Sequence, residues 1–307
     1  MKLLKSSIYI ISLIFLFACE DPVDVDLSSG KAVIVADAIL TNLDTPQKIT
    51  LRKSQPYLSQ NEYEKIQSAT ITMSDSQGND YSFTEKEEGD YYLNENLTNI
   101  QPGQTFDLSI NINSEIFTAK TEIYRVPKID SITWKLDDPL FGSENPNKVW
   151  LAQFWAIDPA GVGDTYWVRR VLNGKVITDN ENIGVLAFDG APGRANDDEN
   201  LELPFIEPIG QSITPGYGGG PPTADTTRLQ LGDTVGVHLY SISDDFADFM
   251  TILDNEIGNK GGLFATPTAN VPTNFQTDSK NIIVGWFQIS NVSEDYGVIS
   301  DQKFTNR

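Results

Sequence analysis

The sequence predicts a mainly β protein with two β-rich domains and one amphipathic helix. Short runs of alternating apolar and polar residues recur along the chain. Turn residues separate these runs every ~8–12 residues, a spacing typical of antiparallel sandwiches. Strong helical spacing of apolar residues occurs only over 244–257. The 307 residues exceed the ~150 of a typical domain, and 39% hydrophobic residues provide material for two cores.

Alternation over 32–126 predicts the first domain, a β-sandwich. Turn residues such as Asp75–Asn79 separate its strands. The expected strands span 32–40, 47–52, 69–74, 81–84, 91–93, 105–112 and 115–126. The order of turn and core positions, Gly89-x-Tyr91 followed by Pro102-Gly103-Gln104-x-Phe106, resembles immunoglobulin-like and carboxypeptidase-regulatory-like domains of bacterial surfaces. This resemblance implies a fold and names no chemistry.

The second domain, a larger β-rich unit, is expected over 127–307, after a boundary at Val126–Pro127. Its expected strands span 129–136, 148–157, 166–172, 234–242, 281–290 and 296–299. The helix has Ser243 as its predicted N-cap and Gly258 as its end signal. Residues 189–226 are rich in Gly, Pro, Asn and Asp, which predicts a long loop and a first candidate for a contact surface.

Residues 1–19 have the pattern of an export signal. Two lysines precede an apolar segment over 8–17, which is too short to span a bilayer as a helix. The block Leu16-Phe17-Ala18-Cys19 resembles a bacterial lipobox, although Phe17 is bulkier than the usual residue there. Lipidation of Cys19, the chain's single cysteine, would anchor the protein without a spanning segment. The alternative is an ordinary signal peptide with an incidental cysteine.

An acidic tether over 20–31 follows the cysteine. Its cluster of Glu20, Asp21, Asp24 and Asp26 resembles the surface-export signal of Bacteroidetes lipoproteins, and a solvated disordered tether is the alternative. We therefore expect a lipid-anchored protein of the outer membrane, exposed at the cell surface. Loss of two lysines with the leader changes the net charge from −21 to −23. This charge disfavours nucleic acid as a partner and direct adsorption to an anionic membrane.

The sequence predicts no catalytic residues. His238 is the only histidine, and neither a G-x-S-x-G motif nor a free cysteine accompanies it, so a catalytic triad or a zinc site is not expected. We interpret His238 as a hydrogen-bonded strand residue. Two carboxylates at the ~5–9 Å spacing of glycoside hydrolases remain open, because sequence does not reveal that spacing.

An acidic loop is the weak candidate for a metal site. Asp197, Asp198 and Glu199 offer the oxygen ligands that calcium prefers, but their spacing is not that of an EF-hand loop. A solvated loop is the favoured interpretation, so we expect no cofactor. Asp244, Asp245 and Asp248 are better explained by the start of the helix.

Aromatic side chains are the candidates for ligand or partner binding. Trp150 and Trp155 are five residues apart, so they face opposite sides of a regular strand. Trp286, in another expected strand, and Tyr217, in the glycine-rich loop, complete the candidate set. Burial in the core is the alternative for each tryptophan.

The C-terminal stretches 261–274 (GGLFATPTANVPTN) and 283–290 (IVGWFQIS) are the most distinctive. Together with 23–42 and 51–57, they resemble a Bacteroidetes lipoprotein family catalogued as domain of unknown function 4249. The resemblance implies an accessory lipoprotein that accompanies a TonB-dependent outer-membrane β-barrel transporter, and it carries over no catalytic residues. A non-enzymatic surface lipoprotein is therefore the leading hypothesis. A carboxylate-dependent surface hydrolase and a structural or adhesive surface protein are the alternatives.

Overall fold

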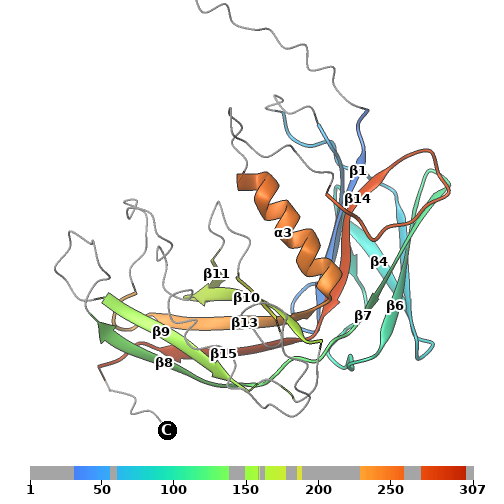
Figure 1. The fold of residues 1–307 in the computed structure, drawn as a ribbon. Coiled ribbons are helices and arrows are strands. Elements are labelled where there is room, and N and C mark those ends of the chain that lie inside the picture. Colours follow the sequence, from blue (N-terminus) through green and yellow to red (C-terminus); the bar gives the residue numbers. More distant parts are fainter. Residues whose placement is uncertain are drawn as a thin grey trace, which may run out of the picture.

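The computed structural model describes residues 31–55, 61–137, 149–157, 159, 163–177, 185–188, 229–258 and 271–301. The leader, Cys19 and almost all of the tether lie outside this part of the chain. So do two predicted sites, Tyr217 and the acidic loop of Asp197, Asp198 and Glu199. The described residues form a mainly β protein with one helix, which confirms the predicted fold class. The strands fall into two groups, here called the first and second modules (Figure 1).

The first module is one eight-stranded sheet in the order β14-β1-β2-β5-β4-β3-β6-β7. Its strands are β1 (Ile34–Thr41), β2 (Lys48–Lys53), β3 (Thr70–Asp75), β4 (Asp80–Glu87), β5 (Asp90–Leu93), β6 (Thr105–Ile112), β7 (Glu115–Glu122) and β14 (Ile283–Ser290). The sheet curls around one apolar core, with the alternating residues Phe106, Leu108 and Ile110 of β6 pointing inward. Residues 274–276 nearly close the curl, because Thr118 and Gln276 exchange two backbone hydrogen bonds of 2.9 and 2.7 Å.

A buried carboxylate organises the turn between β3 and β4. Asp75 accepts hydrogen bonds from the backbone N–H groups of Gln77 and Asn79 and from the side chains of Asn79, Tyr81 and Gln104. Burial alone would raise the pKa of Asp75, but these hydrogen bonds outweigh it and lower the pKa to about 2. The hydrogen bonds to this carboxylate thus come from the turn itself, from β4 and from Gln104, which directly precedes β6.

β14 belongs to the first module although it lies near the end of the chain. It pairs in parallel with β1 over their full length, from Ile34↔Ile283 to Thr41↔Ser290. Gly285 has φ +114°, and a Cβ there would lie 1.9 Å from the carbonyl oxygen of Ala36, so only glycine fits this close approach. The predicted second domain of 127–307 thus includes a strand whose partners are in the first sheet.

The second module contains β8 (Ile129–Asp137), β9 (Val149–Ala156), β10 (Thr165–Leu172), β11 (Lys175–Val176), β12 (Val185–Phe188), β13 (Thr234–Ile242) and β15 (Val292–Val298). β10, β13 and β15 form an antiparallel sheet, with β11 and β12 on the other edge of β10. The predicted hairpin at Asn173–Gly174 is confirmed, with positive φ at both residues. β15 begins at Val292, four residues before the predicted start at Tyr296. The sequence prediction missed these residues because two of them, Glu294 and Asp295, are charged and do not resemble a strand.

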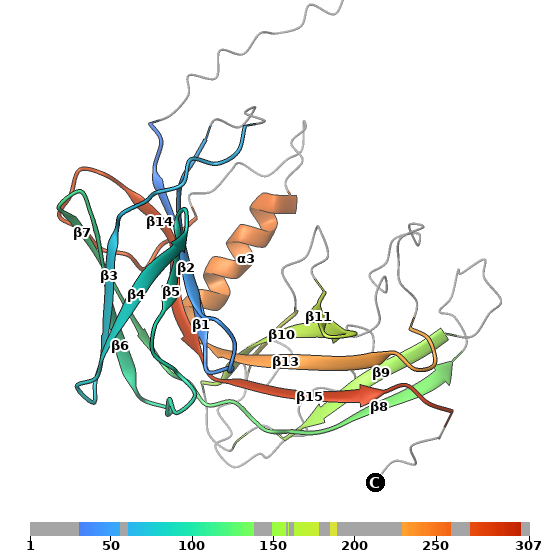
Figure 2. The ribbon, with the colours of Figure 1, turned by 180° about the vertical axis from the view of Figure 1, so that it is seen from behind.

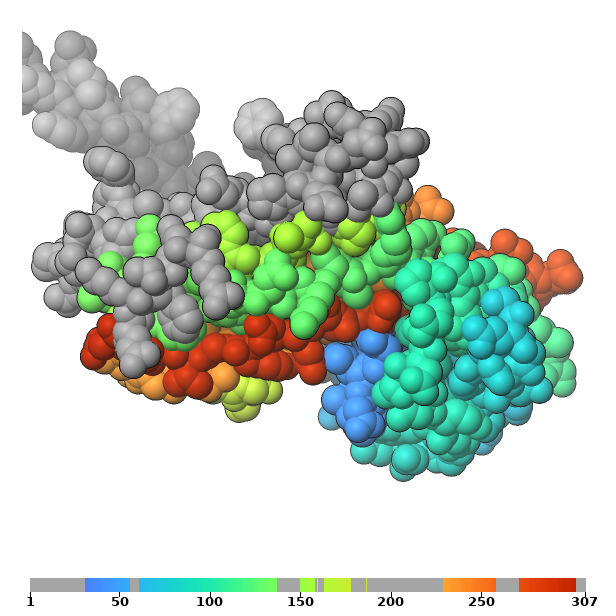
Figure 3. All heavy atoms as spheres, turned by 90° about the horizontal axis from the view of Figure 1, so that it is seen from below, coloured from blue at the N-terminus to red at the C-terminus, as the bar shows by residue number. Residues whose placement is uncertain are grey.

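The hairpin β8–β9 packs under this sheet. Ile132 and Phe154 meet Tyr166, Val237 and Leu239 in a second apolar core. β8 also lies beside β15, where the Ile129 N–H donates to Ser293 Oγ at 3.2 Å. Figure 3 shows the underside, with the red end of the chain along green β8 and the first module at one end.

The helix α3 (Asp244–Gly258) occupies the inner angle between the two modules, which together form an L (Figures 1 and 2). The predicted N-cap is confirmed, since Ser243 Oγ accepts the Phe246 N–H at 3.1 Å. Phe246, Phe249 and Met250 pack in a third apolar cluster with residues of β10, β13 and β14. α3, the one helix of the described chain, is not long and apolar enough to cross a membrane.

Candidate ligand-binding face of the second module

The upper face of the second sheet, on the side of α3, carries an ordered array of polar and aromatic side chains. Cross-strand register places Arg169 of β10 opposite His238 of β13, and His238 opposite Glu294 of β15. The flanking rows are Trp167–Tyr240–Val292, which packs with α3, and Val171–Gly236–Tyr296. We call Trp167, Arg169, His238, Tyr240, Glu294 and Tyr296 the candidate face.

His238 is held by β15 through one ring nitrogen. Its Nε2 lies 2.7 Å from the Tyr296 hydroxyl and 3.1 Å from Glu294 Oε2. The same hydroxyl donates to Glu294 Oε2 at 2.8 Å, and it has only one proton to donate. We therefore assign the imidazole proton to Nε2, which leaves Nδ1 as an acceptor. This agrees with the prediction that His238 is a hydrogen-bonded strand residue.

The other nitrogen of His238 is unsatisfied. His238 is 9% exposed as a whole residue, and Nδ1 is buried without a hydrogen-bond partner among the described residues. Such an orphan acceptor costs about 1–3 kcal/mol relative to a paired one. Burial lowers the pKa of His238 and outweighs the opposite effect of Glu294, while Arg169 lowers it further. The imidazole is therefore neutral at pH 7 and offers a lone pair.

A glycine makes room for Tyr296 to reach the histidine. A Cβ at residue 236 would lie 2.3 Å from Tyr296 Cδ1, so the ring lies across a position that no other residue type leaves empty. The ring meets the His238 imidazole edge-on, with centroids 6.0 Å apart. Burial and the hydrogen bond to Glu294 raise the pKa of Tyr296 to about 12, so its hydroxyl remains a neutral donor.

Arg169 is oriented by aromatic neighbours. Its guanidinium carbon lies 4.8 Å from the centre of the Trp167 ring, and Tyr240 is its diagonal neighbour on β13. Within the described ranges it has no ion pair with a carboxylate. Its cross-strand partner on β13 is His238, and Gly236 is its other diagonal neighbour there. The chain has 43 acidic residues and 22 basic ones, so carboxylates are abundant. A half-buried arginine without an ion pair to any described carboxylate therefore needs an explanation.

The candidate face offers groups that can contact a ligand. The groups that contact His238 Nε2 are a tyrosine and a glutamate, so no serine or cysteine nucleophile is paired with it there. No group of three metal-binding side chains occurs in the part of the chain that the structure describes. The described carboxylates with shifted pKa values all have them lowered, and burial opposes this at Asp75 and Asp90. Hydrogen bonds lower the pKa of Asp75, Glu85, Asp90 and Glu115, the opposite of what a general acid requires.

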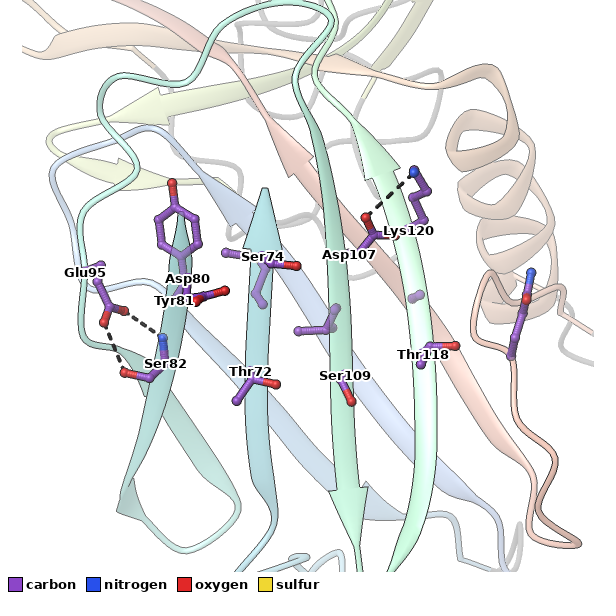
Figure 4. Close-up of a pocket in the computed structure, with 14 residues that line it drawn as sticks. Thr72, Ser74, Asp80, Tyr81, Ser82, Glu95, Asp107, Ser109, Thr118 and Lys120 are labelled. Carbon is purple, nitrogen blue, oxygen red and sulfur yellow. Dashed lines mark hydrogen bonds and ion pairs between the residues drawn. The ribbon is translucent and has the colours of Figure 1, made fainter. Parts of the chain in front are cut away.

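The first module has a second polar surface on the outside of β4, β3, β6 and β7. A row of hydroxyl side chains crosses these strands (Ser82–Thr72–Ser109–Thr118), and a charged row lies beside it (Asp80–Ser74–Asp107–Lys120). They line a shallow groove of about 960 Å³ (Figure 4). Glu95 accepts from the N–H and hydroxyl of Ser82, and Lys120 lies 3.7 Å from Asp107. This is the polar outer face expected of a half-buried sheet.

The structure does not bring the predicted tryptophans together. Trp150 and Trp155 face opposite sides of β9, as their spacing predicts, and both are half-buried. Trp150 packs against the second core, whereas the Trp155 indole donates to Thr133 Oγ1 at 2.9 Å. Trp286 is 9% exposed and contacts Phe246 and Phe249 of α3, so its indole joins the two modules. Ligand binding by these residues stays a prediction.

Sequence reasoning missed Arg169, Glu294 and Tyr296. Alternation in β10 and β15 contained part of the signal, because it assigns each residue to a face. Alternation does not identify the neighbouring strand. The candidate face combines residues of β10, β13 and β15, and β10 is far from the other two strands in the sequence.

Comparison with known proteins shows the family of this chain. A family model described as "Domain of unknown function (DUF4249)" matches residues 20–295. Since this match covers most of the chain, the protein belongs to that family. No curated protein and no solved structure matches the chain significantly.

Proposed function

We propose that this member of the DUF4249 family is a non-enzymatic, surface-exposed lipoprotein of the outer membrane. Cys19 would carry the lipid, and the protein would capture ligand for a TonB-dependent β-barrel transporter. The observation that carries this proposal is the candidate face, which combines an oriented cation with an unused buried acceptor and lacks a paired nucleophile. Such a surface would hold a ligand without reacting with it.

The placement of the second module supports a role in capture. β1 starts close to the tether and runs toward the second module, where the side chains of Asn42 and Asn291 hydrogen-bond at 2.7 Å (Figure 1). The tether of residues 20–31 could extend up to ~40 Å. An anchor at Cys19 would therefore hold the first module by its tether end and present the second module at the opposite end of β1.

Membrane fractionation and co-purification test the proposal. Wild-type protein is expected in the outer-membrane fraction, open to protease added to intact cells, and Cys19→Ala is expected in soluble fractions. Affinity purification from detergent-solubilised outer membrane, followed by mass spectrometry, is expected to recover a β-barrel transporter. Unchanged fractionation of Cys19→Ala would contradict the anchor, and purification without any barrel would contradict the transporter role.

The two alternatives gain no specific support from the described residues. A carboxylate-dependent hydrolase needs a carboxyl group with a raised pKa, whereas the shifted carboxylates here have lowered values. An adhesive or structural role has no feature of the described chain in its favour.

A further inference from the structure

We propose that the candidate face binds a small organic carboxylate, with Arg169 as its anion-binding group and His238 Nδ1 as the acceptor for a neighbouring donor on the ligand. The inference rests on the proposed capture function and names the ligand class for it.

Arg169 meets the requirement for an oriented cation. Stacking against Trp167 orients the guanidinium before any ligand arrives. A guanidinium has five N–H donors in a planar fork that matches the two oxygens of a carboxylate. No carboxylate of the described chain forms an ion pair with this fork. Binding would therefore require little reorganisation of the arginine.

His238 meets the requirement for a second, directional contact. Its Nε2 is already engaged by Tyr296 and Glu294, so the ring cannot turn to satisfy Nδ1 without breaking those contacts. The buried Nδ1 needs a donor, and the register places Arg169 directly opposite His238 on the same face of the sheet. A hydroxyl or amide N–H close to the carboxylate of one small molecule would supply that donor, once the side chains that bury Nδ1 move aside to admit it.

The charge of the surroundings selects a single carboxylate over a polyanion. Glu294 lies in the same row as Arg169, on the far side of His238. The chain as a whole has a net charge of −21, which repels phosphate-rich ligands and weakens their approach. One arginine can neutralise one carboxylate, so an acidic sugar or a peptide C-terminus has suitable chemistry.

A single-site measurement tests this inference. Because His238 is the only histidine, untagged mature protein labelled with ¹⁵N-histidine reports on this imidazole alone. The probes are glucuronate with glucose as its neutral counterpart, and N-acetylglycine with N-acetylglycinamide. We expect at least one carboxylate probe to bind and to shift the Nδ1 resonance, with its neutral counterpart much weaker. The arm that binds distinguishes an acidic sugar from a peptide-like ligand.

Arginine variants provide the matched comparison. Arg169→Gln is expected to weaken the binding of that carboxylate about 10- to 100-fold, the loss of one charge-assisted contact. Arg169→Lys keeps the positive charge but lacks the planar fork, so its affinity for the carboxylate should lie between those of the wild type and Arg169→Gln. Arg52→Gln is the control, because Arg52 also lies over an aromatic ring, that of Tyr63 in the first module. The Arg52→Gln protein should bind the carboxylate as tightly as the wild type.

Three results would overturn the inference. These are equal binding of a carboxylate and its neutral counterpart, wild-type affinity in a folded Arg169→Gln protein, and no binding of either carboxylate. None of these results depends on the transporter. If a transporter co-purifies but the binding test fails, only the proposed ligand class is wrong. Carboxylate binding without any transporter removes the capture function and leaves the site.

Discussion

In the first module the buried carboxylate of Asp75 is surrounded by donors, whereas in the second module the buried imidazole of His238 has one nitrogen without a partner. The arginines differ in the same way. Arg125, which follows β7, forms two hydrogen bonds with the buried Asp164 at 3.2 and 2.5 Å, whereas Arg169 lies over the Trp167 ring and has no ion pair within the described ranges. Polar groups that are fully paired stabilise the fold, and those left incomplete indicate where a ligand can add contacts. The predictions below test this contrast.

The largest effect is expected inside the first module, where β14 pairs with β1. Gly285→Ala would place a Cβ against the Ala36 carbonyl and should reduce the free energy of unfolding by about 4 kcal/mol, measured by urea denaturation. Gly78→Ala is the matched control, because Gly78 also has a positive φ, +89°, but no atom within 4 Å of its Cβ position. Equal losses in the two variants would show that the contact with β1 is unimportant.

The two arginines should differ in their contribution to stability. Arg125→Gln leaves the Asp164 carboxylate, which is 4% exposed, without its charge partner, and should reduce the free energy of unfolding by about 3 kcal/mol. Arg169→Gln removes a cation–π contact and should cost about 1 kcal/mol or less. If Arg169→Gln were the more damaging change, Arg169 would be a structural residue, and the contrast between the modules would fail.

Acid should weaken the first module through Asp75. The pKa of this carboxyl is about 2 in the folded protein and 3.8 in the unfolded chain, so the unfolded chain binds more protons between these values. The stabilisation is complete above pH ~4 and is lost as the pH falls toward ~2, a change of about 1–2 kcal/mol. The difference in unfolding free energy between wild type and Asp75→Asn should shrink over that range. A constant difference would contradict the lowered pKa.

A small change at Gly236 should disturb the candidate face. Gly236→Ala would displace the Tyr296 ring and should cost about 1 kcal/mol, with a shift of the His238 Nε2 resonance. Tyr296→Phe, which removes the hydroxyl and keeps the ring, should produce a similar shift at Nε2 and a smaller loss of stability. An unchanged Nε2 resonance in both variants would show that Tyr296 does not hold the histidine.

The smallest effect on the free energy of unfolding is expected from the protonation of His238. Burial lowers its pKa below the ordinary 6.5 against the attraction of Glu294, and Arg169 acts in the same direction as burial. Tyr240 and Tyr296, which also face the imidazole, remain neutral in this range. The contribution of His238 to stability is therefore present above pH 6.5 and is lost as the pH falls through its folded pKa. A midpoint at or above 6.5 in the ¹⁵N-histidine spectrum would contradict this.

Much of the fold could be predicted because local patterns determine it. Alternation identified the long strands, Ser243 marked the start of the helix, and Asn173–Gly174 marked a hairpin. The pairing of β14 with β1 could not be predicted, since an alternating strand does not specify its neighbour. The candidate face was missed for the same reason, and the burial of Trp286 depends on where α3 docks.

The parallel pairing of β1 with β14 has a mechanical consequence. Tension applied at Lys31 would act along the axis of β1, so its bonds to β14 would be sheared together instead of being peeled apart one after another. β14 continues through Asn291 directly into β15. A load on the start of the described chain would therefore reach the second module through one ladder, while the strands between β2 and β7 stay largely outside the load path.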